Sequence, residues 1–159
     1  NLLHKYKAAI IIATISLVMC NSVIYLGYDP TPSMANTVPS GSFLVGNRLY
    51  HNIERGDIVI FNMDGTYMIK RVIGLPGEEI ELSSSSVFIN EEKYEENYLK
   101  EKPTYNRSAF SINENSYFLL GDNRNNSADS RIFGPVPESN IVAKLLFNVP
   151  LKRNGMPTN

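Results

Sequence analysis

The sequence predicts a mainly β protein that follows a single N-terminal transmembrane helix and has a small β subdomain inserted into its core. Three observations lead to this prediction. A long uncharged apolar run is followed by short β-branched and aromatic runs separated by turn residues, and a Glu-rich segment interrupts these runs once. A length of 159 residues accommodates one main hydrophobic core with a small appendage.

The apolar run covers residues 8–26 and contains 19 residues with no charged side chain. As an α-helix rising about 1.5 Å per residue, it would be roughly 28 Å long, close to the hydrocarbon thickness of a bilayer. Two alternatives are a cleaved secretory signal peptide and a helix buried in a soluble protein. No small-x-small cleavage site follows the run, which favours the membrane anchor.

The charges around this run predict its orientation. Lys5 and Lys7 are the only charged side chains in the first 27 residues, and all 16 acidic residues lie in the remainder. By the positive-inside rule the N-terminus stays in the cytoplasm. We therefore expect residues 1–27 to form a cytoplasmic tip and a single-pass anchor in the cell membrane, and residues 28–159 to form an extracytoplasmic domain.

Short apolar runs bounded by Gly, Pro, Asn or Asp predict the strands of that domain. They cover residues 42–45, 57–61, 67–73, 86–89 and 117–120. The segment 78–115 differs in composition, because eight Glu lie between positions 78 and 101. We interpret it as a smaller inserted subdomain, with a single continuous sheet and long hairpins as the alternative.

Composition excludes several classes of function. The net charge of −1 gives no indication of nucleic-acid binding. The single cysteine, Cys20, lies in the apolar run, so no intramolecular disulfide and no thiol site in the domain are expected. His4 is on the predicted cytoplasmic side, which leaves His51 as the domain's only histidine. We expect no metal and no other cofactor, because the usual ligand set cannot be assembled.

Lys70 is the main candidate for a general base that activates a hydrolase nucleophile. Lys70 and Arg71 are adjacent on the predicted strand 67–73, so their side chains point to opposite faces. We expect one of them to be solvated or paired with an acid and the other to lie against apolar neighbours. A buried lysine loses its proton more easily and can act as a base, whereas arginine cannot. Two surface basic residues, or a base at His51 in its polar turn-like stretch, are the alternatives.

Four sequence blocks occur in a characteristic order. They are Thr31-Pro32-Ser33-Met34, GDIVIF at 56–61, KRVIGLPGE at 70–78 and GDNRNNSADSRIFGPV at 121–136. In this order and at these separations they resemble the type I signal peptidase family in its compact bacterial form. The resemblance extends from the anchor to Pro150, and the last block is the most specific.

The resemblance implies a Ser-Lys dyad on a signal-peptidase-like β core. Ser33 matches the family's nucleophile, and Lys70 matches its general base. Ser127 matches the serine whose hydroxyl hydrogen-bonds the lysine amine. Thr31 lies where the family has a hydroxyl residue that forms the oxyanion hole together with the backbone N–H of the nucleophile, here Ser33.

The resemblance also implies supporting ion pairs and a class of substrate. Asp122, Asp129 and Arg131 match residues that support the site, with Arg71 as the expected partner of Asp122. Family members have a mainly β fold and cleave exported preproteins after small residues at positions −1 and −3. The expected partners are therefore signal peptides of preproteins and the lipid bilayer.

The segment around the nucleophile departs from the family pattern at three places. Asn36 replaces a usual proline, Ser42 replaces an aspartate, and Thr31-Pro32 replaces Ser-Gly. A narrowed range such as pilins or one secreted subset would fit these changes. Pro39-Ser40-Gly41-Ser42-Phe43 imitates a nucleophile loop, but counting from Ser42 places no family motif at the required spacing. We therefore do not expect Ser42 to be the nucleophile.

Apolar residues near the nucleophile have two interpretations. Met34, Phe43 and Leu44 could line shallow substrate pockets or rest on the bilayer, and core packing is the alternative for all three.

Three other functions compete with a general signal peptidase. One is a non-catalytic membrane-anchored pseudo-peptidase that assists pilus or secreted-protein assembly. Another is a self-cleaving repressor protease, which would need a DNA-binding domain where the apolar run lies. The third is a conjugative peptidase of the same superfamily, which would differ in substrate only.

Overall fold

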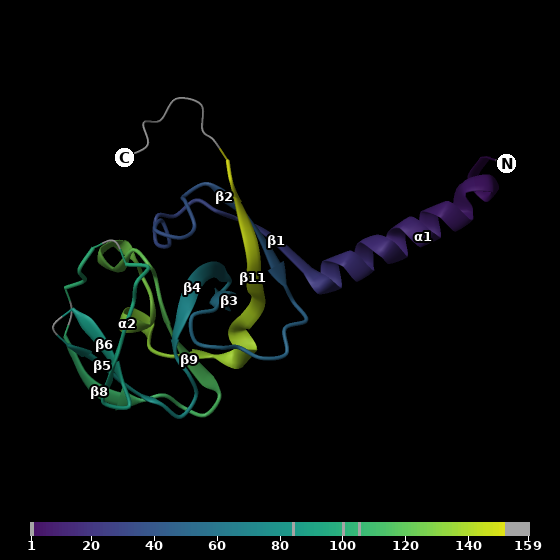
Figure 1. Cartoon of the computed structure of the whole chain (residues 1–159). Helices are drawn as coiled ribbons and strands as arrows, with labels where there is room; N and C mark the ends of the chain where they lie inside the picture. The colour runs from purple at the N-terminus through teal and green to yellow at the C-terminus, as the bar shows by residue number, and fades with distance from the viewer. Residues whose placement is uncertain (1, 84, 100, 105, 152–159) are drawn as a thin grey trace.

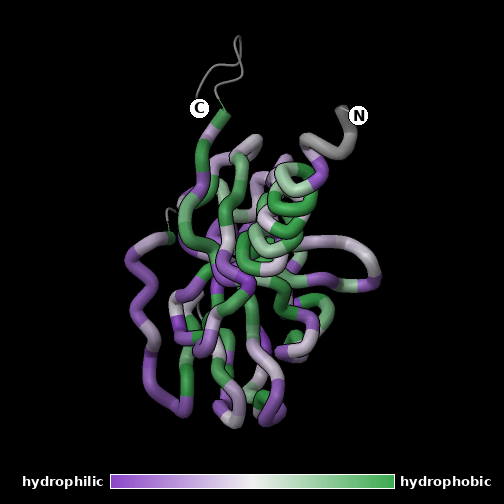
Figure 2. Tube along the Cα trace, turned by 90° about the vertical axis from the view of Figure 1, so that its right-hand side faces the viewer, coloured by the Kyte–Doolittle hydropathy of each residue, from purple (hydrophilic) through white to green (hydrophobic). Residues whose placement is uncertain are grey.

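The computed structural model describes residues 2–83, 85–99, 101–104 and 106–151. The helix α1 (Leu2–Val23) extends away from the rest of the chain (Figure 1). Its segment Tyr6–Val23 has a mean hydropathy of 1.6, is 0% buried, and is long and apolar enough to cross a membrane. The hydropathy colouring of Figure 2 shows that apolar residues dominate this helix.

The helix ends earlier than the apolar run. We expected a helical conformation through Leu26, but Ile24–Asp29 form the strand β1. Their backbone groups pair along their whole length with an antiparallel partner, β2 (Ser42–Asn47). Composition alone does not reveal this boundary, because a lipid-facing helix and a strand with an exposed apolar face both contain uncharged residues.

A seven-stranded sheet forms the main body of the protein. Its order is β1-β2-β11-β3-β4-β9-β10, and every neighbouring pair is antiparallel. The remaining strands of this sheet are β3 (Ile58–Met63), β4 (Thr66–Gly74), β9 (Ser116–Leu120), β10 (Val136–Pro137) and β11 (Ile141–Pro150). The predicted fold class, mainly β with an N-terminal apolar helix, is confirmed.

A second, four-stranded sheet lies between β4 and β9 in the sequence. Its order is β7-β6-β5-β8, formed by β5 (Glu79–Ser83), β6 (Ser86–Ile89), β7 (Glu92–Tyr94) and β8 (Arg107–Ser111). It forms the lower left part of Figure 1. The alternative of one continuous sheet is therefore wrong.

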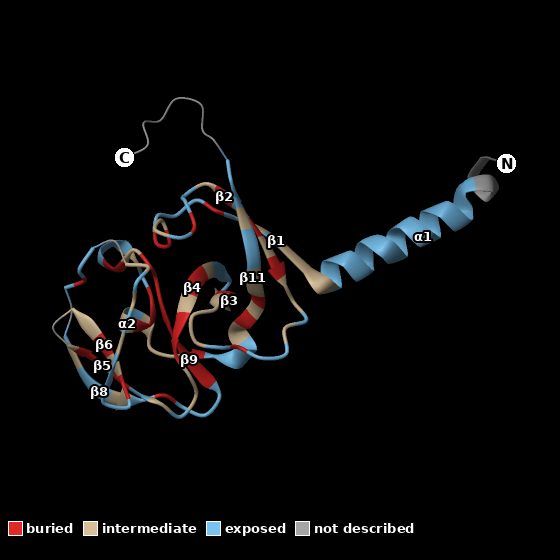
Figure 3. Cartoon of the chain, in the orientation of Figure 1, coloured by how far each residue is buried: buried red, intermediate tan, exposed pale blue. Residues whose placement is uncertain are grey.

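Strand β4 lies between β3 and β9, and hydrophobic clusters bury side chains on both of its faces. Val72 belongs to one cluster of buried side chains, whereas Ile69 and Ile73, on the opposite face, belong to two others. Figure 3 shows buried residues concentrated on these central strands and exposed residues along α1. A cationic side chain on β4 is therefore held inside the protein.

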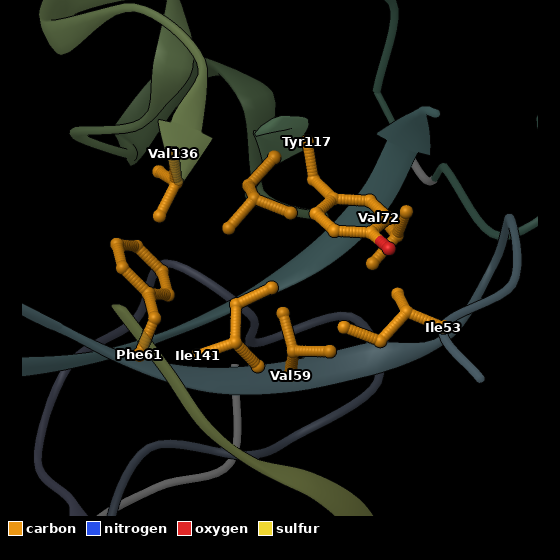
Figure 4. Close-up of a cluster of buried hydrophobic side chains, with 8 residues drawn as sticks. Ile53, Val59, Phe61, Val72, Tyr117, Val136 and Ile141 are labelled. Carbon is orange, nitrogen blue, oxygen red and sulfur yellow. The ribbon is translucent and has the colours of Figure 1, made fainter. Parts of the chain in front are cut away.

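Two phenylalanines of the main sheet should differ in how much they contribute to the free energy of unfolding. Phe61 is 0% exposed and belongs to the cluster shown in Figure 4, together with Val136 and Ile141. We expect Phe61→Ala to lower the free energy of unfolding by about 3–5 kcal/mol, because it removes buried area and leaves a cavity. Chemical denaturation of the detergent-solubilised chain would measure this loss.

Phe147→Ala is the matched control, because Phe147 is 54% exposed. It should cost less than about 1 kcal/mol. Equal losses for the two variants would contradict the assignment of the core.

Candidate active site

The loop between β1 and β2 holds Ser33 on the inside of the protein. Ser33 is 6% exposed, and its neighbour Met34 is fully buried in the core. The carbonyl of Met34 accepts a hydrogen bond of 2.6 Å from the N–H of Val38, which is also buried. The carbonyl of Ser33 accepts one of 2.9 Å from the N–H of Asn123. These contacts fix the serine backbone between the main sheet and the 121–136 block.

Lys70 reaches the same point from β4. It is 4% exposed, and its Nζ donates hydrogen bonds of 2.8 Å to Ser33 Oγ and 2.8 Å to the carbonyl of Ile69. Burial lowers the pKa of the Lys70 amine, against the opposing effects of Asp129, Asp29 and Asp122. The structure thus brings together two residues that are 37 positions apart in the sequence.

Arg71 is paired with an acid, as the sequence predicted for one of the two adjacent basic residues. Its Nε and Nη2 donate hydrogen bonds of 2.8 and 2.6 Å to the two carboxylate oxygens of Asp122. Thr37 donates its hydroxyl to the same carboxylate, and the Asn36 amide donates to the Asp122 carbonyl at 2.9 Å. The ion pair therefore connects β4 to the loop that contains Ser33. Asn36, one of the departures from the family pattern, helps to hold that loop.

Asp129 is fully buried and organises the last sequence block. Its Oδ1 accepts 2.7 Å from Arg131 Nε, and its Oδ2 accepts 2.8 Å from Arg131 Nη2 and 3.0 Å from the N–H of Gly121. It also caps the short helix α2 (Ser130–Phe133) by accepting a hydrogen bond from the Arg131 N–H. Asp129, whose charge is balanced by Arg131, thereby holds the backbone of Gly121 beside Ser33.

Ser127 lies next to the dyad but does not make the expected hydrogen bond to Lys70. Its Oγ is buried and has no hydrogen-bond partner among the described residues. A Cβ placed on Gly121 would lie 2.1 Å from Ser127 Oγ and 2.7 Å from the Ser33 carbonyl oxygen. Ser127 and Ser33 therefore both approach the bare backbone of Gly121, while the Lys70 amine donates to Ser33 and Ile69 instead.

Thr31 lies beside the nucleophile, with its hydroxyl oxygen 3.2 Å from Ser33 Oγ. Its hydroxyl proton, however, is donated to Asp29 Oδ1 at 2.7 Å. Because a threonine hydroxyl has one proton, it donates nowhere else in this conformation. The oxyanion role of Thr31 stays a prediction.

The remaining candidates lie away from the dyad or outside the groove beside it. His51 is exposed. Ser42 is buried, and its hydroxyl donates to the Pro39 carbonyl at 2.6 Å, so it supports a turn. Met34 is core, whereas Phe43 is 49% exposed on the outer face of the sheet. Among the described residues, no group of three or more His, Cys, Asp or Glu could hold a metal ion.

A groove of about 470 Å³ opens beside Ser33 and Lys70. Its apolar wall includes Leu44, Ile60 and Ile69, so Leu44 lines the groove as well as packing in the core.

Sequence reasoning missed a buried cluster that joins the inserted sheet to this site. The buried side chain of Arg124 donates 2.9 Å to the Gly121 carbonyl and 2.9 Å to Glu96, which also accepts 2.5 Å from the Tyr98 hydroxyl. The Arg71 guanidinium lies 4.2 Å from the centroid of the Tyr98 ring. Burial, followed by the charge of Glu96, raises the pKa of Tyr98. Arg124 lies inside a recognised block, but nothing in the Glu-rich segment distinguishes Glu96 from its neighbours.

Comparisons with known proteins show which family the chain resembles. The family model described as "Signal peptidase, peptidase S26" matches residues 2–149. The probable signal peptidase I-1 of Synechocystis sp. is 35% identical over 142 residues, which cover 80% of this chain and 72% of that protein. The probable signal peptidase I-2 of the same organism is 33% identical over 144 residues, and the chain spans only 66% of its length. Signal peptidase I S of Bacillus subtilis is 32% identical over 142 residues, covering 80% of this chain and 77% of that protein.

A solved structure extends the similarity to the fold. The crystal structure of a signal peptidase I from Enterococcus faecalis V583 superposes with a TM-score of 0.55 at 32% sequence identity. The match covers 60% of this chain and 97% of that one.

The close approach at Gly121 predicts that this glycine cannot be replaced. We expect Gly121→Ala to reduce peptide-bond cleavage at least a hundredfold, because its Cβ would displace the backbone of Ser33 and the side chain of Ser127. Cleavage assays together with thermal unfolding would measure the effect. Gly65→Asn is the control, since Gly65 has φ of 87° in open space and asparagine tolerates this conformation. Normal activity of Gly121→Ala would contradict the geometry described here.

Proposed function

Because the chain belongs to the signal peptidase family, peptidase S26, we propose that it is a serine endopeptidase that removes signal peptides from exported preproteins. The observation that supports this most strongly is the 2.8 Å contact between Ser33 Oγ and the buried amine of Lys70. The proposal assigns Ser33 as the nucleophile and Lys70 as the general base.

The reaction would proceed through an ester on Ser33. Neutral Lys70 accepts the hydroxyl proton while Ser33 Oγ attacks the scissile carbonyl carbon. The tetrahedral intermediate collapses as the Lys70 ammonium gives its proton to the leaving amine of the mature protein. Lys70 then takes a proton from water, and the resulting hydroxide attacks the ester carbonyl carbon. The bond between the acyl carbon and Ser33 Oγ breaks as the Lys70 ammonium returns its proton to Ser33 Oγ, and the signal peptide leaves as a carboxylic acid.

Burial explains how a lysine can perform this role. The charged form of Lys70 is disfavoured inside the protein, so its pKa is lowered. Activity should consequently rise with pH through the lowered pKa of Lys70, since only the neutral amine accepts a proton.

Two donors would stabilise the oxyanion in this proposal: the backbone N–H of Ser33 and the hydroxyl of Thr31. The Thr31 hydroxyl donates to Asp29 in the unliganded structure, so its proton must turn away from Asp29, by rotation about the Cβ–Oγ1 bond, when negative charge develops on the substrate. Such a donor typically contributes roughly 3 kcal/mol to transition-state stabilisation.

The substrate would lie extended along the groove, next to the strands that form its wall. Leu44, Ile60 and Ile69 form an apolar surface that suits small side chains at positions −1 and −3. The altered loop around Ser33 favours a dedicated range, such as pilins or one secreted subset.

We further propose that α1 anchors the chain in the cell membrane with the domain outside, as Lys5 and Lys7 predict. An apolar face continues from this helix onto the sheet, because β1, β2 and β11 pair in register. Its exposed members are Leu26, Tyr28, Phe43, Phe147 and Val149. Contact of this face with lipid would keep the groove near membrane-bound preproteins.

A pseudo-peptidase that only assists pilus or secreted-protein assembly is the rival proposal. The contact between Ser33 and a buried Lys70 argues against it, because a binding protein has no need of a costly buried amine.

The dyad predicts the behaviour of two substitutions. Ser33→Ala should abolish cleavage of a preprotein while leaving the fold intact, because the nucleophilic oxygen is lost. Lys70→Arg should be as inactive as Lys70→Ala, since a guanidinium stays protonated and cannot act as a base. Gel analysis of precursor and mature protein, with circular dichroism for folding, would measure both effects. Cleavage by Lys70→Arg at the wild-type rate would mean that the residue acts only through its charge.

The oxyanion assignment predicts a difference between two variants of Thr31. Thr31→Val removes the hydroxyl at nearly constant volume and should lower kcat roughly a hundredfold with little change in KM. Thr31→Ser keeps a donor and should remain active. A Val variant with kcat within about threefold of wild type would remove support for this role and leave the dyad untouched.

A further inference from the structure

Asp29 is a buried carboxylate beside the dyad to which the sequence assigned no role. It is the last residue of β1, and 4% of its surface is exposed. Its backbone carbonyl accepts a hydrogen bond of 2.7 Å from the N–H of Gly41, which closes the loop that contains Ser33. A β-strand and a loop closure therefore both fix its position.

A series of contacts connects Asp29 to the Lys70 amine. Asp29 Oδ1 accepts hydrogen bonds of 2.9 Å from the Thr31 N–H and 2.7 Å from the Thr31 hydroxyl. The Thr31 oxygen lies 3.2 Å from Ser33 Oγ, which lies 2.8 Å from Lys70 Nζ. Because the Thr31 proton is donated to Asp29, the Thr31 oxygen can only accept from Ser33. When Lys70 is protonated, each group in the series donates to the next, and the carboxylate is the final acceptor.

Asp29 differs from the other carboxylates near Lys70. Asp122 and Asp129 each form a two-point ion pair with an arginine. Within the part of the chain that the structure describes, no ion pair involves Asp29, and its Oδ2 is buried without a hydrogen-bond partner. Its charge is therefore not neutralised by a neighbour. Burial lowers the pKa of Lys70, whereas Asp129, Asp29 and Asp122 raise it.

The other titratable groups that line the groove are phenols. Tyr25, Tyr28 and Tyr67 line the groove together with Asp29 and Lys70. Burial raises the pKa of the Tyr25 phenol. Among the described residues that line the groove, Asp29 is the one acidic and Lys70 the one basic side chain.

We propose that Asp29 is a positioning residue for the reaction: its carboxylate holds Thr31 beside Ser33 and provides a fixed negative charge that stabilises the Lys70 ammonium. This inference rests on the proposed peptidase function. Lys70 becomes an ammonium ion as it removes the Ser33 proton, so the charge of Asp29 lowers the energy of that transition state. The same charge also raises the pH at which the resting amine becomes neutral.

The variant Asp29→Asn separates charge from shape. Asparagine keeps an oxygen that can accept from Thr31, but it has no negative charge. We expect the acid limb of kcat/KM against pH to move to lower pH by roughly one unit, because the Lys70 ammonium loses a stabilising charge. Above that limb, kcat should fall about tenfold with little change in KM. The assay uses the full chain in detergent with a preprotein substrate.

Two controls make the measurement specific. Asp64→Asn removes an exposed carboxylate from the turn between β3 and β4, and it should leave the acid limb in place. In a Thr31→Val background, Asp29→Asn should reduce kcat less than in the wild type, because the contact between Asp29 and the Thr31 hydroxyl is already lost, while the limb should still move. Asp29→Ser removes the same charge with a smaller side chain and repeats the test if the Asn variant does not fold.

The outcomes distinguish this inference from the proposed function. An acid limb that stays in place in Asp29→Asn, with wild-type or reduced kcat, overturns the role of Asp29 and leaves the dyad standing. A chain that cleaves no preprotein, or a Ser33→Ala variant that cleaves normally, overturns the proposed function and the inference with it. A shifted limb accompanied by a non-additive effect with Thr31→Val supports the inference.

Discussion

The rest of the site depends on the burial of the Lys70 amine against Ser33. A lysine that is 4% exposed destabilises the folded protein when it is charged, so the surrounding structure must hold it there. Strand β4 does so because it lies inside a seven-stranded sheet with buried side chains on both faces. The loop between β1 and β2 is held opposite by Met34, which is fully buried.

The carboxylates around this amine have a double effect. Asp122 and Asp129 hold the backbone of the 121–136 block through arginine ion pairs, and together with Asp29 they raise the pKa of Lys70 that burial lowers. Both of these carboxylates are paired with an arginine, and burial outweighs the combined effect of the three carboxylates on the pKa of the Lys70 amine. Asp29 has no such partner among the described residues. It is the carboxylate whose charge, in our proposal, adjusts the balance between burial and nearby negative charge at the Lys70 amine.

Much of this arrangement could be predicted from the sequence, and the remainder shows what sequence patterns lack. The strands and the inserted segment were predicted because turn residues and composition delimit them. The end of α1 at Val23 was not predicted, because Ile24, Tyr25 and Leu26 are apolar enough for either a membrane helix or a strand. Asp29 and Glu96 were missed because their importance comes from burial and from partners that only the folded chain brings near. The absent hydrogen bond between Ser127 and Lys70 is likewise a matter of side-chain geometry at Gly121.

Direct titration of the Lys70 side chain would test the central claim. Nuclear magnetic resonance of isotope-labelled lysines in the full chain, with the Lys70 signal identified by its loss in Lys70→Ala, gives the pKa without relying on a substrate. The structure predicts a midpoint below the ordinary lysine value of about 10.4, because burial lowers the pKa of the amine. A midpoint at or above that value would contradict the account, since Lys70 would then remain charged and could not accept the proton of Ser33.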